Sequence, residues 1–273
     1  MARFRAACVQ VNAGREFAAN IEAACRFIRH AREQGADLVC LPENVSLLEP
    51  VTSRLKALAL PEDEHPALKA FTGLAKESGA WILIGSLAIR SENGLIANRS
   101  FLLDDTGAIA ARYDKIHLFD VDIGPGQQYR ESDTFTPGTQ PVVVQTPWGG
   151  LGLSICYDLR FPALYRRLAQ TGADCLCVPA AFTRTTGEAH WHVLLRARAI
   201  ENGCFVFAPA QCGTHAEGRQ TFGHSLIIDP WGTVLADGGE GPGIIIADVD
   251  TDNVTAARRR VPALYHERPL HDS

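Results

Sequence analysis

The sequence lacks an apolar run long enough to cross a bilayer. Its longest apolar runs, such as residues 243–248 and 226–228, have the length of strands, whereas a membrane-spanning helix needs about 20 mostly apolar residues. The first residues, MARFRAACVQV, also lack the extended apolar core of a secretory signal peptide. We therefore expect a soluble, cytoplasmic protein with no membrane partner.

The chain has no strong excess of charge of either sign. It carries 26 Lys and Arg against 31 Asp and Glu, a formal net charge of −5. A protein that binds nucleic acid usually carries a clustered basic surface, so no nucleic-acid partner is expected. No linker, low-complexity tract or charge block divides the 273 residues, and a chain of this length can bury one full core. We therefore expect a single domain that spans residues 1–273.

None of the eight cysteines is spaced as C-x-x-C. A zinc site needs a tighter cluster of Cys and His than this sequence offers, so no metal site is expected. Without an export signal the thiols should stay reduced, and roughly six or seven of them are interpreted as small buried packing residues. The cysteines stand at positions 8, 25, 40, 156, 175, 177, 204 and 212.

Apolar segments of strand length alternate with amphipathic segments of helix length. Strands are predicted at residues 4–10, 38–41, 81–87, 95–103, 109–113, 142–145, 151–156, 175–178, 205–210, 224–228 and 243–249. Helices are predicted at residues 66–78, 162–170, 190–202 and 251–260, and a further one begins near Phe17 and ends before Gly35. Hairpin turns near Asp105 and Trp231 add antiparallel pairs to this alternation, so we expect a layered α/β domain with mixed sheets.

Two charged residues stand at the ends of apolar segments. Glu43 follows the predicted strand 38–41 and Pro42, at the carboxyl end of a strand, where α/β proteins usually bind ligands. Lys115 lies among apolar and aromatic residues at the start of segment 115–142, which is predicted as a long functional loop. Taken singly, Glu43 could equally cap a helix or face solvent, and an isolated lysine is usually solvated.

Cys156 is the cysteine with the strongest catalytic signal. In residues 151–156, large apolar side chains alternate with Gly152, Ser154 and Cys156, whose small side chains leave space on one face. We predict a sharp turn from this strand into a helix, which would place the thiol beside the first amides of that helix and favour the thiolate. Such a turn resembles the nucleophile elbow of hydrolases, although G-x-S-x-G is absent. The alternative is one more buried cysteine.

Three separated motifs occur in an order that resembles the nitrilase superfamily of carbon–nitrogen hydrolases. They are L-P-E at Glu43, R-Y-D-K-I-H-L-F-D at Lys115 and S-I-C-Y-D-L-R-F-P at Cys156, and the similarity extends from A-C-V-Q at residues 7–10 to D-P-W-G at residues 229–232. The resemblance implies a single-domain α-β-β-α sandwich in which two mixed sheets are flanked by helices. It also implies a Glu–Lys–Cys triad of these three residues, a second glutamate at Glu131, and a homodimer or larger homo-oligomer.

The resemblance assigns each of these residues a role that suits its chemistry. Cys156 would attack an amide carbon and form an acyl-thioester. Glu43 would accept the thiol proton, pass it to the leaving nitrogen and then activate water. Lys115, with a backbone amide near Tyr157, would stabilise the tetrahedral oxyanion. Glu131 would orient Lys115 or the substrate nitrogen and help to keep the lysine protonated. This mechanism needs no metal and no organic cofactor.

The residues around the triad narrow the substrate to a small amide. Tyr-Asp follows Cys156, whereas true nitrilases resemble one another in having Trp-Glu there, so nitriles are not expected as substrates. Residues 180–191 and 194–202 resemble the small-amidase branch. Residues 209–215 and 259–265 resemble the deaminated glutathione amidases, with omega-amidases that act on the keto acid of glutamine as the alternative.

The candidate substrates are anionic, so a carboxylate-binding arginine is expected. We predict Arg184 for this role, with Phe182 and Thr183 beside it in the substrate-binding segment. Arg160, next to the nucleophile, could instead be structural. Three further charged residues are interpreted as ion-pairing residues on a helix surface: Arg196, Arg198 and Glu201.

Two functions of other classes remain open from the sequence. A catalytically inactive binding or scaffold protein would keep the fold, although all three residue types of the triad are present. A metal-dependent amidohydrolase would need clustered histidine ligands. His190 and His192, however, are two residues apart and are expected on different faces of a helix.

Overall fold

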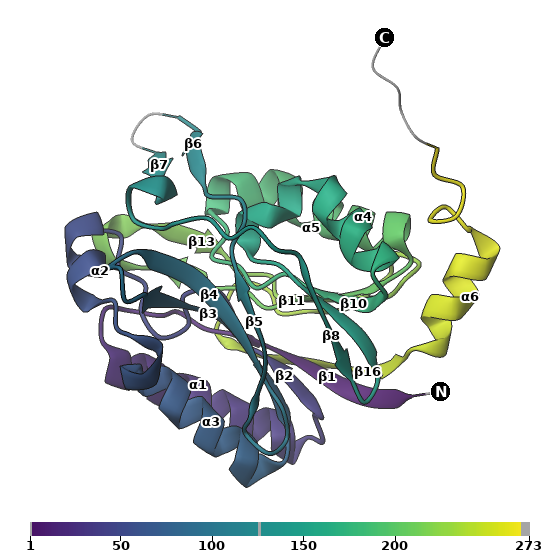
Figure 1. Cartoon of the computed structure of the whole chain (residues 1–273), viewed down its shortest axis with the longest axis horizontal. Coiled ribbons are helices and arrows are strands. Elements are labelled where there is room, and N and C mark those ends of the chain that lie inside the picture. The colour runs from purple at the N-terminus through teal and green to yellow at the C-terminus, as the bar shows by residue number, and fades with distance from the viewer. Residues whose placement is uncertain (1, 125–126, 269–273) are drawn as a thin grey trace.

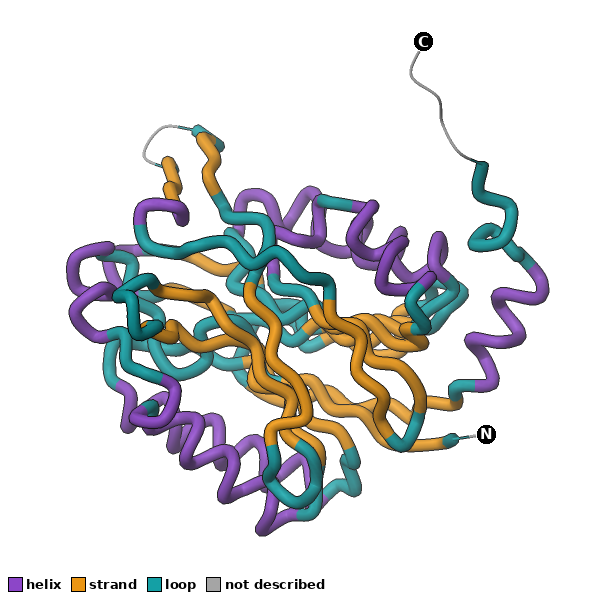
Figure 2. The backbone as a smooth tube through the Cα atoms, in the orientation of Figure 1, coloured by secondary structure: helices purple, strands orange, loops and turns teal. Residues whose placement is uncertain are grey.

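Two six-stranded sheets pack face to face between two layers of helices (Figure 1, Figure 2). The computed structural model describes residues 2–124 and 127–268. The predicted α-β-β-α sandwich with mixed sheets is confirmed. Within the described ranges, no helix is both long and apolar enough to cross a membrane.

The first sheet is built mainly from the N-terminal half of the chain, in the strand order β16-β1-β2-β3-β4-β5. The bounds are β1 (Arg3–Gln10), β2 (Leu38–Cys40), β3 (Trp81–Arg90), β4 (Ile96–Leu103), β5 (Ile109–Asp114) and β16 (Gly243–Asp250). β1, β2 and β3 run parallel, whereas β4, β5 and β16 pair antiparallel with their neighbours. Helices α1 (Phe17–Glu33) and α3 (Pro66–Ser78) cover its outer face, where Ile28 and Phe71 are fully buried.

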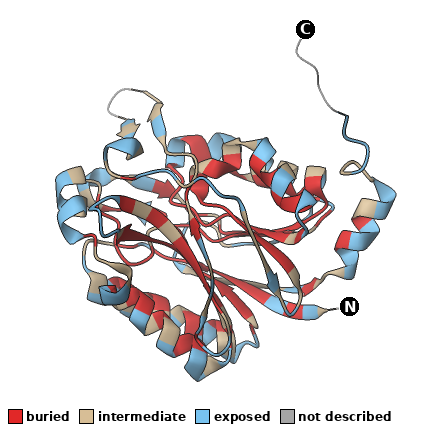
Figure 3. Cartoon of the chain, viewed as in Figure 1, coloured by how far each residue is buried: buried red, intermediate tan, exposed pale blue. Residues whose placement is uncertain are grey.

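The second sheet has the order β15-β14-β11-β10-β9-β8. The bounds are β8 (Val142–Thr146), β9 (Gly149–Leu153), β10 (Ala173–Cys177), β11 (Phe205–Ala208), β14 (Leu226–Ile228) and β15 (Val234–Asp237). Helices α4 (Pro162–Gln170) and α5 (Arg184–Asn202) cover its outer face, and α6 (Asp252–Arg260) follows β16. Leu83 of the first sheet and Leu153 of the second belong to one continuous core. Figure 3 shows buried segments running through both sheets and along the helix sides that face them.

Segment 115–142, predicted as a long loop, contains regular structure. It holds a hairpin of β6 (Asp120–Asp122) and β7 (Gln128–Arg130), followed by the 3-10 turn Glu131–Asp133. Strands of three residues are too short to leave an alternating pattern in the sequence, which explains why they escaped prediction. The hairpin of β12 (Cys212–Thr214) and β13 (Gln220–Phe222) was missed in the same way, and helix α2 (Thr52–Leu58) was also not predicted.

Helix α5 begins at Arg184 and not at residue 190 as predicted. The residues T-T-G in its first turn favour a turn locally, but tertiary packing overrides that preference. A Cβ at Gly187 would lie 2.3 Å from Cβ of Phe222, so only glycine lets this part of the helix approach β13. By contrast, α3 has the predicted bounds because its end signals are local.

Candidate active site

Glu43 is buried three residues beyond the end of β2. The amide of Leu41 donates to the carbonyl of Leu83 at 2.8 Å, so the chain stays against β3 for one further residue. A Cβ at Gly85 would lie 2.1 Å from the Leu41 carbonyl oxygen, so this close approach requires glycine. Glu43 is only 3% exposed, and its Oε2 accepts a hydrogen bond from the amide of Ala181 at 2.8 Å.

Lys115 is buried between two glutamates. Its Nζ lies 3.0 Å from Oε1 of Glu43 and 2.8 Å from Oε2 of Glu131. Burial alone would favour the neutral amine, but the two carboxylates raise the pKa of Lys115 above its ordinary value. Burial likewise opposes ionisation of Glu43, but the charge of Lys115 outweighs it and lowers the pKa of Glu43. Near neutral pH the lysine is therefore a cation and Glu43 an anion.

Asn98 of β4 holds the two glutamates together. Its Nδ2 donates to Oε1 of Glu43 at 3.0 Å and to Oε1 of Glu131 at 3.1 Å. The amide of Phe119 also donates to Oε2 of Glu131, at 2.6 Å. Sequence analysis missed Asn98, because a single polar residue in a strand is equally compatible with a solvent-facing position. The second glutamate is thus fixed by Asn98 of β4 and by Lys115 and Phe119 of one other segment.

Cys156 stands on a strained turn beyond the end of its strand. The strand predicted at residues 151–156 ends earlier, because β9 stops at Leu153. Cys156 is the first residue of the 3-10 turn Cys156–Arg160. Its φ of +48° lies in the left-handed region, which residues with a Cβ rarely adopt. Its amide donates to the carbonyl of Pro179 at 2.9 Å. Among the residues that the structure describes, the next amide, that of Tyr157, has no acceptor.

The thiolate predicted for Cys156 is not the form that this site favours at rest. Burial, and after it the charge of Glu43, raises the pKa of Cys156 well above its ordinary value, and Lys115 offsets this only in part. The sequence argument relied on the amides of a following helix, but Cys156 opens a short 3-10 turn and α4 begins only at Pro162. A neutral thiol beside the Glu43 carboxylate can instead transfer its proton to that carboxylate during attack.

The buried carboxylate of Asp158 ties the Cys156 turn to the segment that carries Lys115. Its Oδ2 accepts a hydrogen bond from the hydroxyl of Tyr113 at 2.6 Å. Its Oδ1 lies 3.0 Å from the amide nitrogen and 2.7 Å from Nδ1 of His117. Because Tyr113 and His117 flank Lys115, this single carboxylate sets the position of the lysine relative to the nucleophile.

A cavity of about 400 Å³ opens at these side chains, a size typical of small-molecule sites. Seven of the eight residues predicted for the site line it, namely Glu43, Lys115, Glu131, Cys156, Tyr157, Phe182 and Thr183. Arg184 does not. It borders a neighbouring hollow, its side chain is 46% exposed, and it pairs with Glu188 at 3.0 Å and with Glu240 at 3.6 Å. A role for Arg184 in reading substrate charge stays a prediction.

The carbon–nitrogen hydrolase family matches residues 5–259, almost the whole chain. This chain belongs to that family. It is an enzyme that hydrolyses carbon–nitrogen bonds other than peptide bonds, as the three motifs indicated.

Known relatives agree with this assignment. The chain is 45% identical over 271 residues to a protein of Synechocystis sp. named deaminated glutathione amidase, covering 97% of this chain and 98% of the relative. Among solved structures it is similar to the NitFhit protein of C. elegans, with a TM-score of 0.92, 36% identity and coverage of 97% of this chain and 65% of that one. An amidase variant from Nesterenkonia sp. AN1, with a TM-score of 0.78, 28% identity and coverage of 96% and 99%, carries acrylamide added at its active site cysteine.

In this carbon–nitrogen hydrolase, Arg198 is not the surface residue that was predicted. It is 5% exposed, and its Nε and one terminal nitrogen donate to the carbonyl of Leu159 at 3.0 and 2.7 Å. Its other terminal nitrogen pairs with Glu201 at 2.9 Å. Arg196 likewise donates to a backbone carbonyl, that of Gly232, at 2.8 Å. The spacing of charged residues along a helix cannot show which arginine side chain points into the protein. Through Leu159, Arg198 supports the 3-10 turn that carries Cys156.

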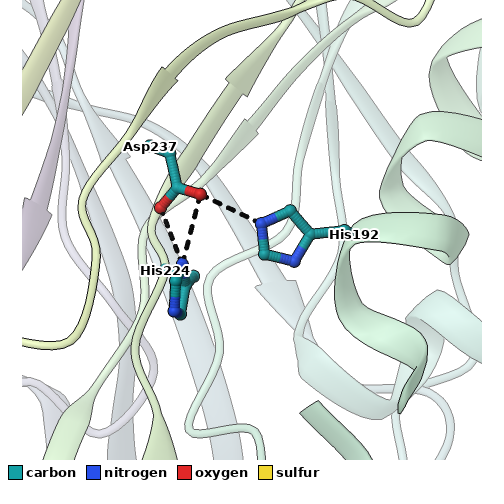
Figure 4. Close-up of side chains that lie close together, drawn as sticks. All are labelled: His192, His224 and Asp237. Carbon is teal, nitrogen blue, oxygen red and sulfur yellow. Dashed lines mark hydrogen bonds and ion pairs between the residues drawn. The ribbon is translucent and has the colours of Figure 1, made fainter. Parts of the chain in front are cut away.

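A second cluster of ionisable side chains consists of residues that do not line the cavity of the hydrolase, and Figure 4 shows its three members. His192 of α5 and His224 lie 3.0 and 2.9 Å from the carboxylate oxygens of Asp237 in β15. Sequence analysis compared only neighbouring histidines and so missed this grouping. The three ligand atoms lie within 4.8 Å of one another and could hold a metal, but none of the three residues lines the cavity that contains Cys156. The cluster therefore links α5 to the second sheet and contributes no ligand at the nucleophile.

Asp158→Asn is expected to lower both stability and activity. Both carboxylate oxygens of Asp158 accept hydrogen bonds. The asparagine side chain has only one acceptor oxygen, and its N–H₂ group would face a donor, so at least one buried donor loses its acceptor. We expect the free energy of unfolding to fall by about 3 kcal/mol and kcat to fall roughly tenfold or more, because Lys115 shifts relative to Cys156. Denaturant unfolding and amide turnover measure the two effects. Asp105→Asn in an exposed turn is the matched control. An Asp158→Asn enzyme that behaves like this control would show that Asp158 does not fix the Cys156 turn to the segment of Lys115.

Proposed function

We propose that this carbon–nitrogen hydrolase is a cysteine-dependent amidase that cleaves deaminated glutathione through an acyl-thioester on Cys156. The observation that carries the proposal is that Glu43, Lys115 and Cys156 line one cavity, where Glu43 and Lys115 form a buried ion pair at 3.0 Å. The name of the Synechocystis relative supports the substrate. This name agrees with the resemblance of residues 209–215 and 259–265 to the deaminated glutathione amidases.

Acylation begins with the thiol of Cys156 next to the carboxylate of Glu43. The thiol proton passes to Glu43 as sulfur bonds to the amide carbon, and the carbonyl oxygen becomes an oxyanion. The Lys115 ammonium and the free amide of Tyr157 are the donors proposed for this oxyanion. Glu43 then gives the proton to the leaving nitrogen, the carbon–nitrogen bond breaks, and an amine departs from an acyl-thioester.

Deacylation uses the same groups with water as the nucleophile. Glu43 accepts a proton from a water molecule while the oxygen of that water bonds to the thioester carbon. The second tetrahedral intermediate collapses, the carbon–sulfur bond breaks, and Glu43 returns the proton to the sulfur of Cys156. Glu131 keeps Lys115 in place and charged throughout, because it contacts Nζ with both carboxylate oxygens at 3.0 and 2.8 Å.

Release of 2-oxoglutarate tests the proposed substrate. Both deaminated glutathione and the keto acid amide derived from glutamine contain the same keto-glutaryl acyl group, so mass spectrometry of this one product gives comparable kcat/KM values. A higher value for deaminated glutathione supports the proposal. A preference for the smaller amide would establish the omega-amidase alternative and leave the triad standing. No product from either substrate, with no acyl adduct on Cys156, would favour an inactive scaffold.

The kcat/KM for a non-ionisable amide is expected to be flat between about pH 5 and pH 9. The pKa of Glu43 lies below its ordinary value of 4.5, so the base loses its charge only as the pH falls further. The pKa values of Lys115 and Cys156 lie above their ordinary values, so the cation and the thiol persist as the pH rises. A loss of activity centred near pH 6.5 would instead place a histidine in the mechanism and contradict these assignments.

We further propose that the enzyme is a cytoplasmic homodimer. Helix α5 presents Val193 and Ile200 to solvent, 68% and 54% exposed, and Trp231 is 51% exposed. Large apolar side chains left exposed often mark a protein interface. All eight cysteines are free, which suits a reducing compartment. Light scattering of the purified protein tests the dimer, and a monomer at micromolar concentration would contradict it.

A further inference from the structure

Arg219 is a cation in the cavity wall with unused hydrogen-bonding capacity. It follows the 3-10 turn Ala216–Gly218 and lines the same cavity as Cys156. One terminal nitrogen donates to the carbonyl of Ala181 at 3.3 Å. Its Nε is buried and has no hydrogen-bond partner within residues 2–124 and 127–268. The other terminal nitrogen, Nη1, also has no partner among the described residues, so it can donate to an acceptor that enters the cavity.

The other cations of this wall differ from Arg219 in their surroundings. Lys115 contacts two carboxylates, and Arg130 is exposed and donates from one terminal nitrogen to two backbone carbonyls. Arg219, in the described part of the chain, forms no ion pair; its contacts are the Ala181 carbonyl and the ring of Tyr129, whose centre lies 5.7 Å from Cζ. The aromatic ring supports the guanidinium group and leaves its polar edge free.

The loop that carries Arg219 is held by other contacts. Arg15 pairs with Glu217 of this loop at 2.5 Å, and the ring of His215 bonds to a backbone carbonyl at 2.9 Å and to a hydroxyl at 2.7 Å. None of these bonds uses the Arg219 guanidinium. Changing that group should therefore leave the loop in place and alter mainly what the cavity can bind.

The charge around the nucleophile explains why a free cation is needed. Glu43 and Glu131 place two negative charges against the one positive charge of Lys115, so an anionic substrate would meet net repulsion. We propose that Arg219 binds a carboxylate of the substrate and makes the cavity selective for anionic amides. The planar fork of a guanidinium matches a carboxylate, which can accept hydrogen bonds from its terminal nitrogens. This inference rests on the proposed amidase function.

Arg219 suits this role better than Arg184, the arginine predicted from the sequence. Arg184 is half-exposed, borders a different hollow and is already paired with Glu188 and Glu240. Arg219 borders that hollow as well, but it also lines the cavity that contains Cys156, and it has no acidic partner among the residues described.

Two matched pairs of amides separate the effect of charge from that of size. Glutaramate and glutaramide share one acyl chain and differ in a terminal carboxylate, whereas N-butanoylglycine and its amide place the same difference on the leaving group. The kcat and KM for all four are measured with the wild type, Arg219→Gln, Arg219→Lys and Arg184→Gln. For Arg219→Gln we expect kcat/KM to fall about 10- to 100-fold for the carboxylate member of one pair, mainly through KM. Its neutral partner should change by less than about threefold.

The remaining outcomes each decide a point. The pair whose carboxylate member loses kcat/KM shows which end of the substrate carries the bound carboxylate. The loss in kcat/KM should be smaller for Arg219→Lys than for Arg219→Gln, because lysine keeps the charge but not the planar fork. Equal losses on charged and neutral amides would overturn the proposal, since Arg219 would then only support the cavity wall. A charge-selective loss in Arg184→Gln alone would overturn it in favour of Arg184.

A binding measurement keeps this test separate from turnover. Calorimetry with glutarate compares the Cys156→Ser protein with the Cys156→Ser, Arg219→Gln double variant. Tenfold or weaker binding in the double variant supports the carboxylate site even if no amide is cleaved, in which case only the proposed amidase function fails. Equal affinity in the two proteins would overturn the carboxylate site.

Discussion

Cys156→Ser is expected to reduce kcat for every amide substrate by at least about a thousandfold while the fold stays intact. A hydroxyl is similar in size to a thiol but much harder to deprotonate. Glu43 is a weak base, because Lys115 and the amide of Ala181 hold its pKa below the ordinary value despite burial. Proton transfer from the thiol is already demanding, since burial raises the pKa of Cys156. The change to oxygen therefore removes the nucleophile, and the acyl adduct should disappear from the intact mass spectrum.

Two other cysteines provide matched controls for this substitution. Cys175 and Cys177 lie in β10, are 4% and 1% exposed, and do not line the cavity. Their serine variants place a hydroxyl in an apolar core, so they should lower the melting temperature more than kcat. Circular dichroism and turnover separate the two effects. Near wild-type activity in Cys156→Ser would remove Cys156 from the mechanism, and an equally deep catalytic loss in a control would point to the wrong cysteine.

Lys115→Arg is expected to lower kcat about a hundredfold or more although it keeps the positive charge. The ammonium is a compact donor that sits within 3.0 Å of both Glu43 and Glu131 in a position only 2% exposed. A guanidinium is larger and planar, so it cannot occupy this position and still aim one donor at the oxyanion. The arginine would also displace the glutamates, which disturbs the base as well as the oxyanion donor.

Steady-state kinetics with neutral glutaramide tests this substitution without involving the carboxylate site at Arg219. Lys69→Arg on the exposed face of α3 is the matched control and should retain wild-type turnover. If Lys115→Arg raised KM but kept the maximal rate, Lys115 would be a substrate-binding residue and not an oxyanion donor.

Local signals in the sequence were sufficient for some elements and not for others. Helix α3 begins with Pro66 and is followed by Gly79 in the left-handed conformation, and both signals are visible in the sequence. The start of α5 depends on Gly187 meeting Phe222 of a distant hairpin. No local pattern contains that contact. The hairpin of β6 and β7 was missed because each of its strands has only three residues.

The sequence by itself determined which residue types stand at the three motifs, and so the family and the chemistry expected of Glu43, Lys115 and Cys156. The protonation state of Cys156 was decided by the tertiary structure, because its pKa depends on burial and on the nearby charge of Glu43. The partner of Glu43 was decided in the same way. The amide of Ala181 is 138 positions away in the chain and meets Glu43 only in the folded protein.

Which arginine faces the cavity was also decided by the tertiary structure. Glu188, four residues after Arg184, is a partner that the sequence could suggest, but the pairing of Arg184 with Glu240 and the place of Arg219 in the cavity wall depend on the fold. Hydrogen-bond partners, burial and pKa values depend on distances through space between segments that are far apart along the chain. A motif records the residues that a reaction needs, whereas the folded chain sets the distances at which they act.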